Sequence, residues 1–224
     1  GGTADLRIGN GTNTTTGLQG SIFNCTGVEE INFPSRVVSI GNQAFAECYS
    51  LKKVTFDADS RLKEIRMQAF SKCQNLQYIE FPANLEVISE SAFEMNKTKT
   101  SALINLRFGN GAAKVDDSGN ELKDINGNTI YEVDEACKLK TIMTKAFYGT
   151  GITSFVIPNS VETLGESIFE SCRKLDTVTL SRNLKVFDNA FNGCKAVIQM
   201  PEGGGINFDA IDGGVIYSKD KTTL

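Results

Sequence analysis

The sequence contains no histidine among its 224 residues. Without histidine the chain lacks the commonest general base, and it cannot form a Ser-His or Cys-His nucleophilic pair. The remaining acid–base candidates are two adjacent carboxylate pairs, Asp116–Asp117 and Asp134–Glu135. They lie in Gly- and Asn-rich sequence, which is typical of solvated loops. The sequence therefore predicts a protein that is not an enzyme.

The sequence also lacks an excess of positive charge. Its 23 Lys and Arg are outnumbered by 27 Asp and Glu, which gives a net charge of −4 and a pI near 5.1. A nucleic-acid partner requires a basic surface to neutralise phosphates, so we expect no nucleic-acid partner. No uninterrupted apolar run reaches about 18 residues, and we expect no membrane span in this segment. The chain begins with Gly-Gly and has no signal-peptide pattern, so we expect its targeting information to lie outside this sequence.

Cysteine is sparse, with six residues and no C-x-x-C pair. Because histidine is absent too, the spacing expected of a zinc site is missing. Two glycine-rich stretches, Gly9–Gly17 and Gly109–Gly119, lack the Lys-Ser/Thr ending of a phosphate-binding loop. We therefore expect no metal and no cofactor.

Although the sequence lacks these motifs, it contains a clear internal repeat. A phenylalanine recurs at intervals of 22, 25, 23, 54, 22 and 22 residues, at Phe23, Phe45, Phe70, Phe93, Phe147, Phe169 and Phe191. A branched apolar residue precedes it by five positions in six copies, and a segment of alternating apolar and polar residues follows it. Period-2 alternation predicts strands with one buried face, and the short "AF" step before them predicts one helical turn. Units of about 23 residues cannot bury their own apolar side chains, so they stack into a solenoid.

The recurring pattern I-x(4)-F-x-x-C-x-x-L-x-x-V-x-F-P, seen from Ile40 to Phe56 and from Ile65 to Pro82, resembles the BspA-like class of leucine-rich repeats. The expected fold is an α/β solenoid, a right-handed leucine-rich repeat array of about seven repeats with parallel strands and short helical turns, over residues 1–224. The resemblance implies a secreted or cell-surface bacterial protein that binds host or neighbouring proteins in adhesion.

The position three residues after each Phe carries a short side chain that can donate a hydrogen bond. Its occupants are Thr26, Cys48, Cys73, Asn96, Thr150, Cys172 and Cys194. We expect a ladder of donors to buried backbone carbonyls, with the cysteines as reduced thiols. Disulfides between neighbouring coils remain open, because the coil spacing of about 4.8 Å would allow Cys48 to pair with Cys73. A metal cluster or a catalytic thiol is the third alternative.

The long interval of 54 residues indicates an insertion, over residues 109–136. Asp124, Asn126, Asn128 and Glu135 fall at positions 1, 3, 5 and 12 of an EF-hand loop, but Thr129 stands where that loop needs glycine. The Asn126–Gly127 step instead predicts a β-hairpin. A similar sequence at residues 206–224 predicts a terminal hairpin module, which we expect to be truncated.

The outward positions of the predicted strands form a mixed polar surface. We expect binding to involve Glu30, Lys53, Tyr78, Glu80, Asn105 and Arg107. Tyr and Arg are the residue types most often found as anchors of interfaces. The sequence thus predicts a protein-binding scaffold with an unidentified protein partner. The alternatives are an architectural spacer segment of a larger surface protein and a glycan-binding surface protein.

Overall fold

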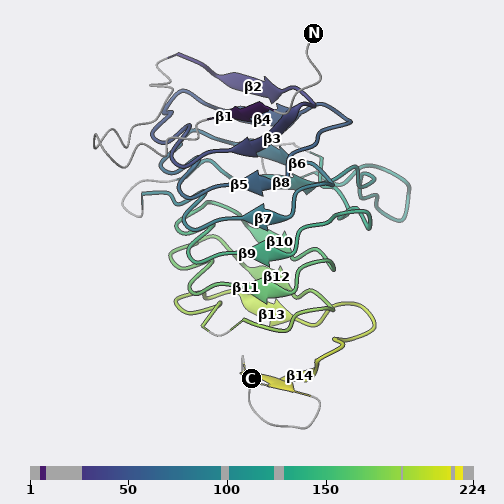
Figure 1. Cartoon of the computed structure of the whole chain (residues 1–224). Helices are drawn as coiled ribbons and strands as arrows, with labels where there is room; N and C mark the ends of the chain where they lie inside the picture. The colour runs from purple at the N-terminus through teal and green to yellow at the C-terminus, as the bar shows by residue number, and fades with distance from the viewer. Residues whose placement is uncertain are drawn as a thin grey trace.

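The structure is a computed structural model that describes residues 6–8, 27–96, 101–123, 129–187, 189–212 and 215–218. These residues form an elongated parallel β-solenoid of about seven turns, with the first and the last described strands toward opposite ends of the stack (Figure 1). Each coil contributes a short strand to one side and a longer strand to the other. The right-handed sense of the array stays a prediction, which the strong preference for right-handed crossovers supports.

The first side is a six-stranded parallel sheet in which every strand pairs with the equivalent strand of the next coil. It contains β1 (Leu6–Ile8), β3 (Val37–Ile40), β5 (Glu64–Ile65), β7 (Val87–Ile88), β9 (Thr141–Ile142) and β11 (Thr163–Leu164). In β3, β5, β7, β9 and β11 the strand ends at the branched residue that precedes the Phe by five positions, and Ile40, Ile65, Ile88 and Ile142 are register partners in turn. The sequence pattern did not predict this sheet.

The second side carries the strands that the alternating pattern predicted. A four-stranded parallel sheet contains β2 (Glu30–Phe33), β4 (Lys53–Phe56), β6 (Tyr78–Phe81) and β8 (Asn105–Phe108). A three-stranded parallel sheet contains β10 (Ser154–Val156), β12 (Thr177–Thr179) and β13 (Val197–Gln199). The predicted single sheet is therefore divided between β8 and β10, where the insertion leaves the array.

The "AF" step is not a helical turn, and no helix is found in the described residues. The residue two positions before the Phe has a left-handed backbone in six coils, as at Gln43 (φ 54°) and Gln68 (φ 56°), and this conformation ends any helix. Alternate backbone N–H groups then donate to the next coil, as from Gln43 to Met67 O and from Phe45 to Ala69 O. Hydrogen bonds between coils replace the hydrogen bonds within a helix.

Stacked phenylalanine rings run through the core of the solenoid. The rings of Phe45, Phe70, Phe93, Phe147 and Phe169 follow one another at centroid distances of 5.3, 5.4, 5.5 and 6.1 Å. All five are buried, and each fully buried side chain of this size stabilises the fold by about 1.5–3 kcal/mol.

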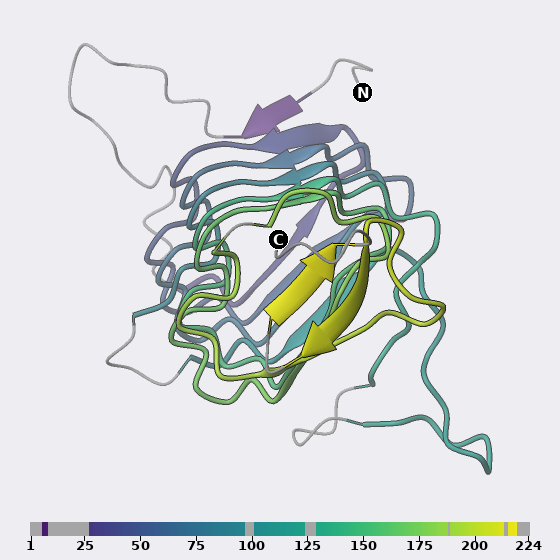
Figure 2. The same ribbon diagram turned by 90° about the horizontal axis from the view of Figure 1, so that it is seen from below.

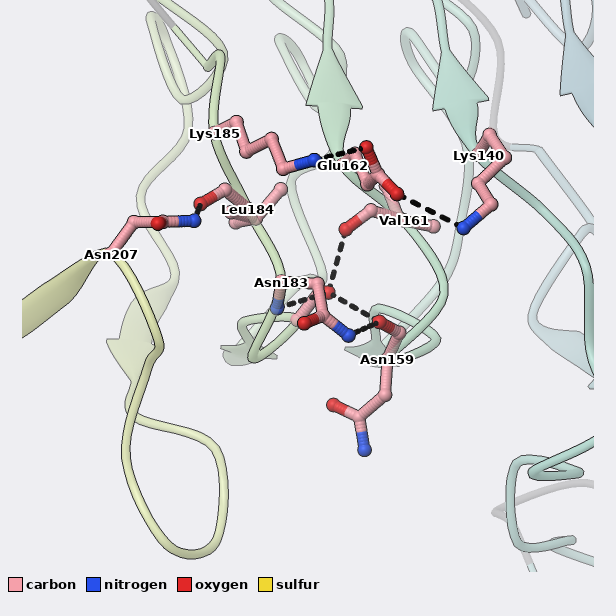
Figure 3. A network of polar contacts seen from close by, with 9 residues as sticks. Lys140, Asn159, Val161, Glu162, Asn183, Leu184, Lys185 and Asn207 are labelled. Atoms are coloured by element: carbon pink, nitrogen blue, oxygen red, sulfur yellow. Dashed lines mark hydrogen bonds and ion pairs between the residues drawn. The ribbon is translucent and has the colours of Figure 1, made fainter.

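Polar side chains join neighbouring coils along the outside of the turns that enter the six-stranded sheet (Figure 3). Glu162 accepts hydrogen bonds from Lys140 at 3.0 Å and from Lys185 at 2.7 Å, so three consecutive coils are linked. Asn183 Nδ2 donates to Asn159 O at 2.6 Å, and Asn207 Nδ2 donates to Leu184 O at 2.7 Å. The carbonyls of Asn159 and Leu184 thus each accept a hydrogen bond from a side chain of the next coil.

An antiparallel hairpin closes the C-terminal end of the stack. Strands β14 (Phe208–Asp212) and β15 (Val215–Ser218) pair with each other and lie across the last coil (Figure 2). The Phe208 side chain is fully buried, and its ring contacts Phe187 at a centroid distance of 6.2 Å. The hairpin therefore covers apolar surface that the last coil would otherwise expose.

The insertion extends sideways from the array, as Figure 2 shows. Antiparallel bridges join Ala113 to Tyr131, Val115 to Glu121 and Lys123 to Thr129. Its base is held by Asp134, whose carboxylate accepts hydrogen bonds from Asn110 N and Ala136 N at 2.8 Å each. These bonds lower the pKa of Asp134. The predicted Asn126–Gly127 turn lies outside the described residues.

Candidate functional site

The outward side chains of the four-stranded sheet are the candidate site. Tyr78 of β6 is the register partner of Asn105 of β8, and Glu80 is the partner of Arg107. Glu30 and Lys53 are exposed register partners on β2 and β4. The parallel stacking of equivalent strands thus brings the six predicted binding residues onto one surface.

Three of these residues form a connected polar cluster. The Tyr78 hydroxyl donates to Glu80 Oε1 at 2.7 Å, and Arg107 Nη1 donates to the same oxygen at 2.9 Å. Lys53 Nζ lies 6.0 Å from the centroid of the Tyr78 ring, at the outer limit of a cation–π contact. These contacts hold Tyr78 in one orientation on the sheet.

The insertion adds a second tyrosine to the surface. The guanidinium of Arg107 lies 4.2 Å from the centroid of the Tyr131 ring, and Arg107 Nη2 donates to Gly111 O at 3.3 Å. Asn105, which is buried, donates from Nδ2 to Thr129 O at 3.3 Å. Arg107 and Asn105 therefore act from the sheet to fix the inner part of the insertion. The binding role predicted for Arg107 and Asn105 stays a prediction, and Tyr131, which the sequence analysis did not name, lies beside Arg107.

Together the sheet and the insertion enclose a surface hollow of about 650 Å³, which we call the tyrosine hollow. Its lining includes Glu30, Lys53, Tyr78, Glu80, Thr129 and Tyr131. Four of these six residues were predicted as binding residues from the strand pattern, whereas Thr129 and Tyr131 were not. The single sequence signal for Tyr131 was an aromatic residue within the polar insertion.

The electrostatics of the hollow favour neutral hydrogen bonding over acid–base chemistry. Burial, followed by the hydrogen bond to Glu80, raises the pKa of Tyr78, so its hydroxyl remains protonated at physiological pH. Burial acts to lower the pKa of Arg107, but the hydrogen bond and the charge of Glu80 prevail and raise it. The cluster therefore consists of two tyrosine rings beside an ion pair of Arg107 and Glu80.

Two cysteines show the hydrogen bonds made at the position three residues after each Phe. Cys73 Sγ donates to Phe45 O at 3.0 Å, and Cys172 Sγ donates to Phe147 O at 3.1 Å, so each thiol satisfies a carbonyl of the preceding coil. Thr150 Oγ1 donates to Phe147 O within its own coil at 2.9 Å. Burial raises the pKa of Cys73 to about 12 and that of Cys172 to about 11, and thiols of this kind are unreactive.

Other members of the ladder depart from the expectation. Cys48 was predicted to be a reduced thiol and is disulfide-bonded, although not to Cys73, which is free. Asn96 is exposed, and Cys194 is only partly buried at the end of the array. Thr26 lies outside the described residues. The hydrogen bond to a Phe carbonyl is thus seen at Cys73, Thr150 and Cys172.

No group of three or more metal-ligating side chains is found in the part of the chain that the structure describes. Three of the EF-hand positions, Asp124, Asn126 and Asn128, lie outside it. Nor does that part contain a helix long and apolar enough to cross a membrane.

A sequence profile of the BspA type leucine rich repeat region matches the chain in six copies, over residues 12–116 and 126–203. The chain belongs to the BspA-type leucine-rich repeat family. No curated protein sequence matches it.

Solved structures of three bacterial proteins, two of them described as leucine-rich repeat proteins, are similar to this one. The pneumococcal vaccine antigen PcpA is 25% identical with a TM-score of 0.50, over 87% of this chain and 35% of the antigen's. The T. pallidum leucine-rich repeat protein is 25% identical with a TM-score of 0.57, over 76% of this chain and 68% of the other. A Bacteroides ovatus leucine-rich repeat protein is 24% identical with a TM-score of 0.51, over 76% and 37%. The BspA-type chain thus spans about a third of two of these proteins.

Proposed function

We propose that this BspA-type chain is a non-catalytic protein-binding scaffold of a secreted or cell-surface protein, and that the tyrosine hollow is its contact surface. The observation that carries the proposal is the position of Tyr131, which the insertion holds beside the sheet through Arg107. Tyr131 lies outside the hydrophobic core of the solenoid, so its aromatic side chain adds nothing to the packing of that core. An aromatic pair flanked by fixed charges is typical of the centre of a protein interface.

The surface location is supported by the family and by the pneumococcal relative, which is a vaccine antigen. Repeat solenoids expose extended surfaces that commonly bind other proteins, and the family and fold are typically non-catalytic. The absence of histidine from the sequence agrees with a binding role.

The test is a binding assay of the immobilised chain against a panel of purified serum and extracellular-matrix proteins. Tyr78→Ala is the test variant. Thr177→Ala is the matched control. Thr177 in β12 follows Leu175 by two residues, just as Tyr78 in β6 follows Leu76 by two residues, so the two hold equivalent places in their repeats. We expect Tyr78→Ala to weaken binding of a positive protein at least about tenfold, as loss of an interface anchor does, and Thr177→Ala to leave it unchanged.

Two results would point elsewhere. Equal affinity of the wild-type chain and Tyr78→Ala would place the contact away from the hollow. A chain that binds no protein in the panel but binds on a glycan array would favour a glycan-binding surface protein, and a chain that binds in neither assay would favour an architectural spacer.

A further inference from the structure

Cys48 is bonded to another cysteine, although its position in the repeat belongs to a ladder of free thiols. The sequence contains six cysteines, and four of them are free: Cys73, Cys137, Cys172 and Cys194. The sixth is Cys25, which lies outside the described residues. Within one chain, elimination therefore leaves Cys25 as the partner of Cys48.

The burial of Cys48 opposes a bond to a second molecule. Its side chain is fully buried, and the turn around it is hydrogen-bonded, with Cys48 N donating to Phe45 O at 3.3 Å and Leu51 N donating to Cys48 O at 3.2 Å. A sulfur atom of another chain would reach Cys48 only if this turn opened. The bond is therefore expected to lie within the chain.

Cys25 differs from the other cysteines that follow a Phe in its place within the repeat. Thr26 fills the donor position of the first repeat and Cys25 stands one residue earlier, whereas Cys48 stands in the donor position of the second repeat. Two cysteines that both hold the donor position do not bond, because Cys73 is free and its Sγ donates to Phe45 O. The repeat pattern thus gives Cys25 no donor role, and a bond to Cys48 accounts for its presence.

We propose that a disulfide between Cys25 and Cys48 ties the first repeat to the second and forms in an oxidising compartment. The two thiols give up two protons and two electrons as the S–S bond forms, and these reduce a disulfide of the oxidant to two thiols. Such bonds persist in exported proteins and are rare in the cytosol. The inference goes beyond the proposed function, because the bond forms whether or not the chain binds a partner.

The bond closes a loop of the chain that contains β2 and β3. In the described part of the structure, β2 is the first strand of its sheet and pairs along one edge only, with β4. Glu30 of β2 lines the tyrosine hollow and is the register partner of Lys53. Closing a loop limits the freedom of the unfolded chain, and each coil of a repeat array contacts only its neighbours. Reduction is therefore expected to loosen β2 and to leave the later coils unchanged.

The first test maps the bond in wild-type protein that has been exposed to oxidised glutathione and alkylated at its free thiols. Trypsin cleaves after Arg36, between the two cysteines, so the unreduced digest should contain the peptide with Cys25 joined to the peptide with Cys48. Reductant should separate the two peptides. The oxidised protein, denatured without reductant, should show only the thiols of the four free cysteines.

The second test measures what the bond does to the fold. Cys25→Ser removes it, and Cys73→Ser is the matched control, because Cys73 holds the donor position of the next repeat and is free. Without reductant, Cys25→Ser should lower the thermal midpoint by about 5 °C or more. Reductant should lower the midpoints of the wild-type chain and of Cys73→Ser and leave that of Cys25→Ser unchanged. Amide exchange in β2 should quicken on reduction, whereas exchange in β9 and β11 should not change.

Four results would each overturn the proposal. They are six thiols in the oxidised protein, a bond from Cys48 to a cysteine other than Cys25, a linked peptide found only in a disulfide-bonded dimer, and a wild-type thermal midpoint that reductant leaves unchanged. The mapping needs no variant, so it decides the pairing even where Cys25→Ser fails to fold.

Discussion

Phe93 and Phe147 stack nearly parallel, with ring centroids 5.5 Å apart and planes inclined by 7°, although 54 residues separate them in the sequence. The core of the solenoid therefore continues past the insertion as if the two coils were consecutive. The insertion changes only the side that carries the longer strands. The insertion therefore leaves the array at that point without interrupting the core.

Replacing residues 113–131 by Asn-Gly should leave a folded solenoid. Ala112 and Glu132 would flank the new two-residue turn, and Glu132 N already donates to Ala112 O at 2.8 Å, as such a turn requires. The change removes the Arg107–Tyr131 contact, which corresponds to about 1–2 kcal/mol of unfolding free energy. Circular dichroism should show one cooperative thermal transition, and any protein that depends on Tyr131 should no longer bind. Loss of cooperative unfolding would instead mean that the insertion belongs to the core.

Ser171 lies two residues after Phe169 and has a left-handed backbone, with φ at 65°. The equivalent positions hold Gly149 (φ 67°) and Gly193 (φ 69°), which adopt this conformation without steric cost. We therefore expect Ser171→Gly to raise the free energy of unfolding by up to about 1 kcal/mol. Ser171→Val should lower it, because a β-branched residue is poorly tolerated there. Urea unfolding of both variants measures the difference, and a destabilised Ser171→Gly would contradict the role assigned to the backbone.

The same positions show what the sequence could and could not reveal. Parallel strands with Val54, Ile79 and Val178 turned inward followed from period-2 alternation, and all three are buried. The left-handed residues escaped notice because Gln, Glu, Lys, Ser and Asn hold most of these positions in the described coils, and Gly holds only positions 149 and 193. The six-stranded sheet escaped because strands of two residues are too short to show a period. The break after β8 lies beside the insertion, and the contact between Arg107 and Tyr131 there is one that no local pattern encodes.

Cys73 should be replaceable according to donor ability and size. Its thiol satisfies Phe45 O in a fully buried position, so Cys73→Ser should fold with a modest loss, whereas Cys73→Leu should overpack the turn and cost about 1–3 kcal/mol. Because burial raises the pKa of Cys73 to about 12, its native thiol should not react with Ellman's reagent at pH 8. Denatured, unreduced protein should yield fewer than six thiols, because Cys48 is disulfide-bonded. Six thiols would exclude that disulfide.

Glu162 accepts hydrogen bonds from Lys185 and Lys140, and these bonds lower its pKa below the ordinary value near 4.5 (Figure 3). Because the pKa of Glu162 is lower in the folded state, the ionised carboxylate stabilises the fold at pH values above the pKa that Glu162 has in the unfolded chain. The contribution is lost as the pH falls through the folded-state pKa. Glu162→Gln should therefore lower the thermal midpoint at pH 7 and have little effect near pH 3.

The matched control is Glu86→Gln. In the wild-type chain the Glu86 carboxylate accepts a hydrogen bond from Lys63 at 2.9 Å. Glu162 pairs with two lysines on two neighbouring coils, whereas Glu86 pairs with Lys63. The decrease in the thermal midpoint at pH 7 should therefore be larger for Glu162→Gln than for Glu86→Gln. Both shifts should shrink as sodium chloride is raised, because exposed ion pairs are screened. A shift for Glu162→Gln that persists unchanged at pH 3 or in 1 M salt would show that the side chain acts through packing. In that case the stacking of the coils alone would place Lys140 and Lys185 near Glu162, and the ion pairs would not stabilise the fold.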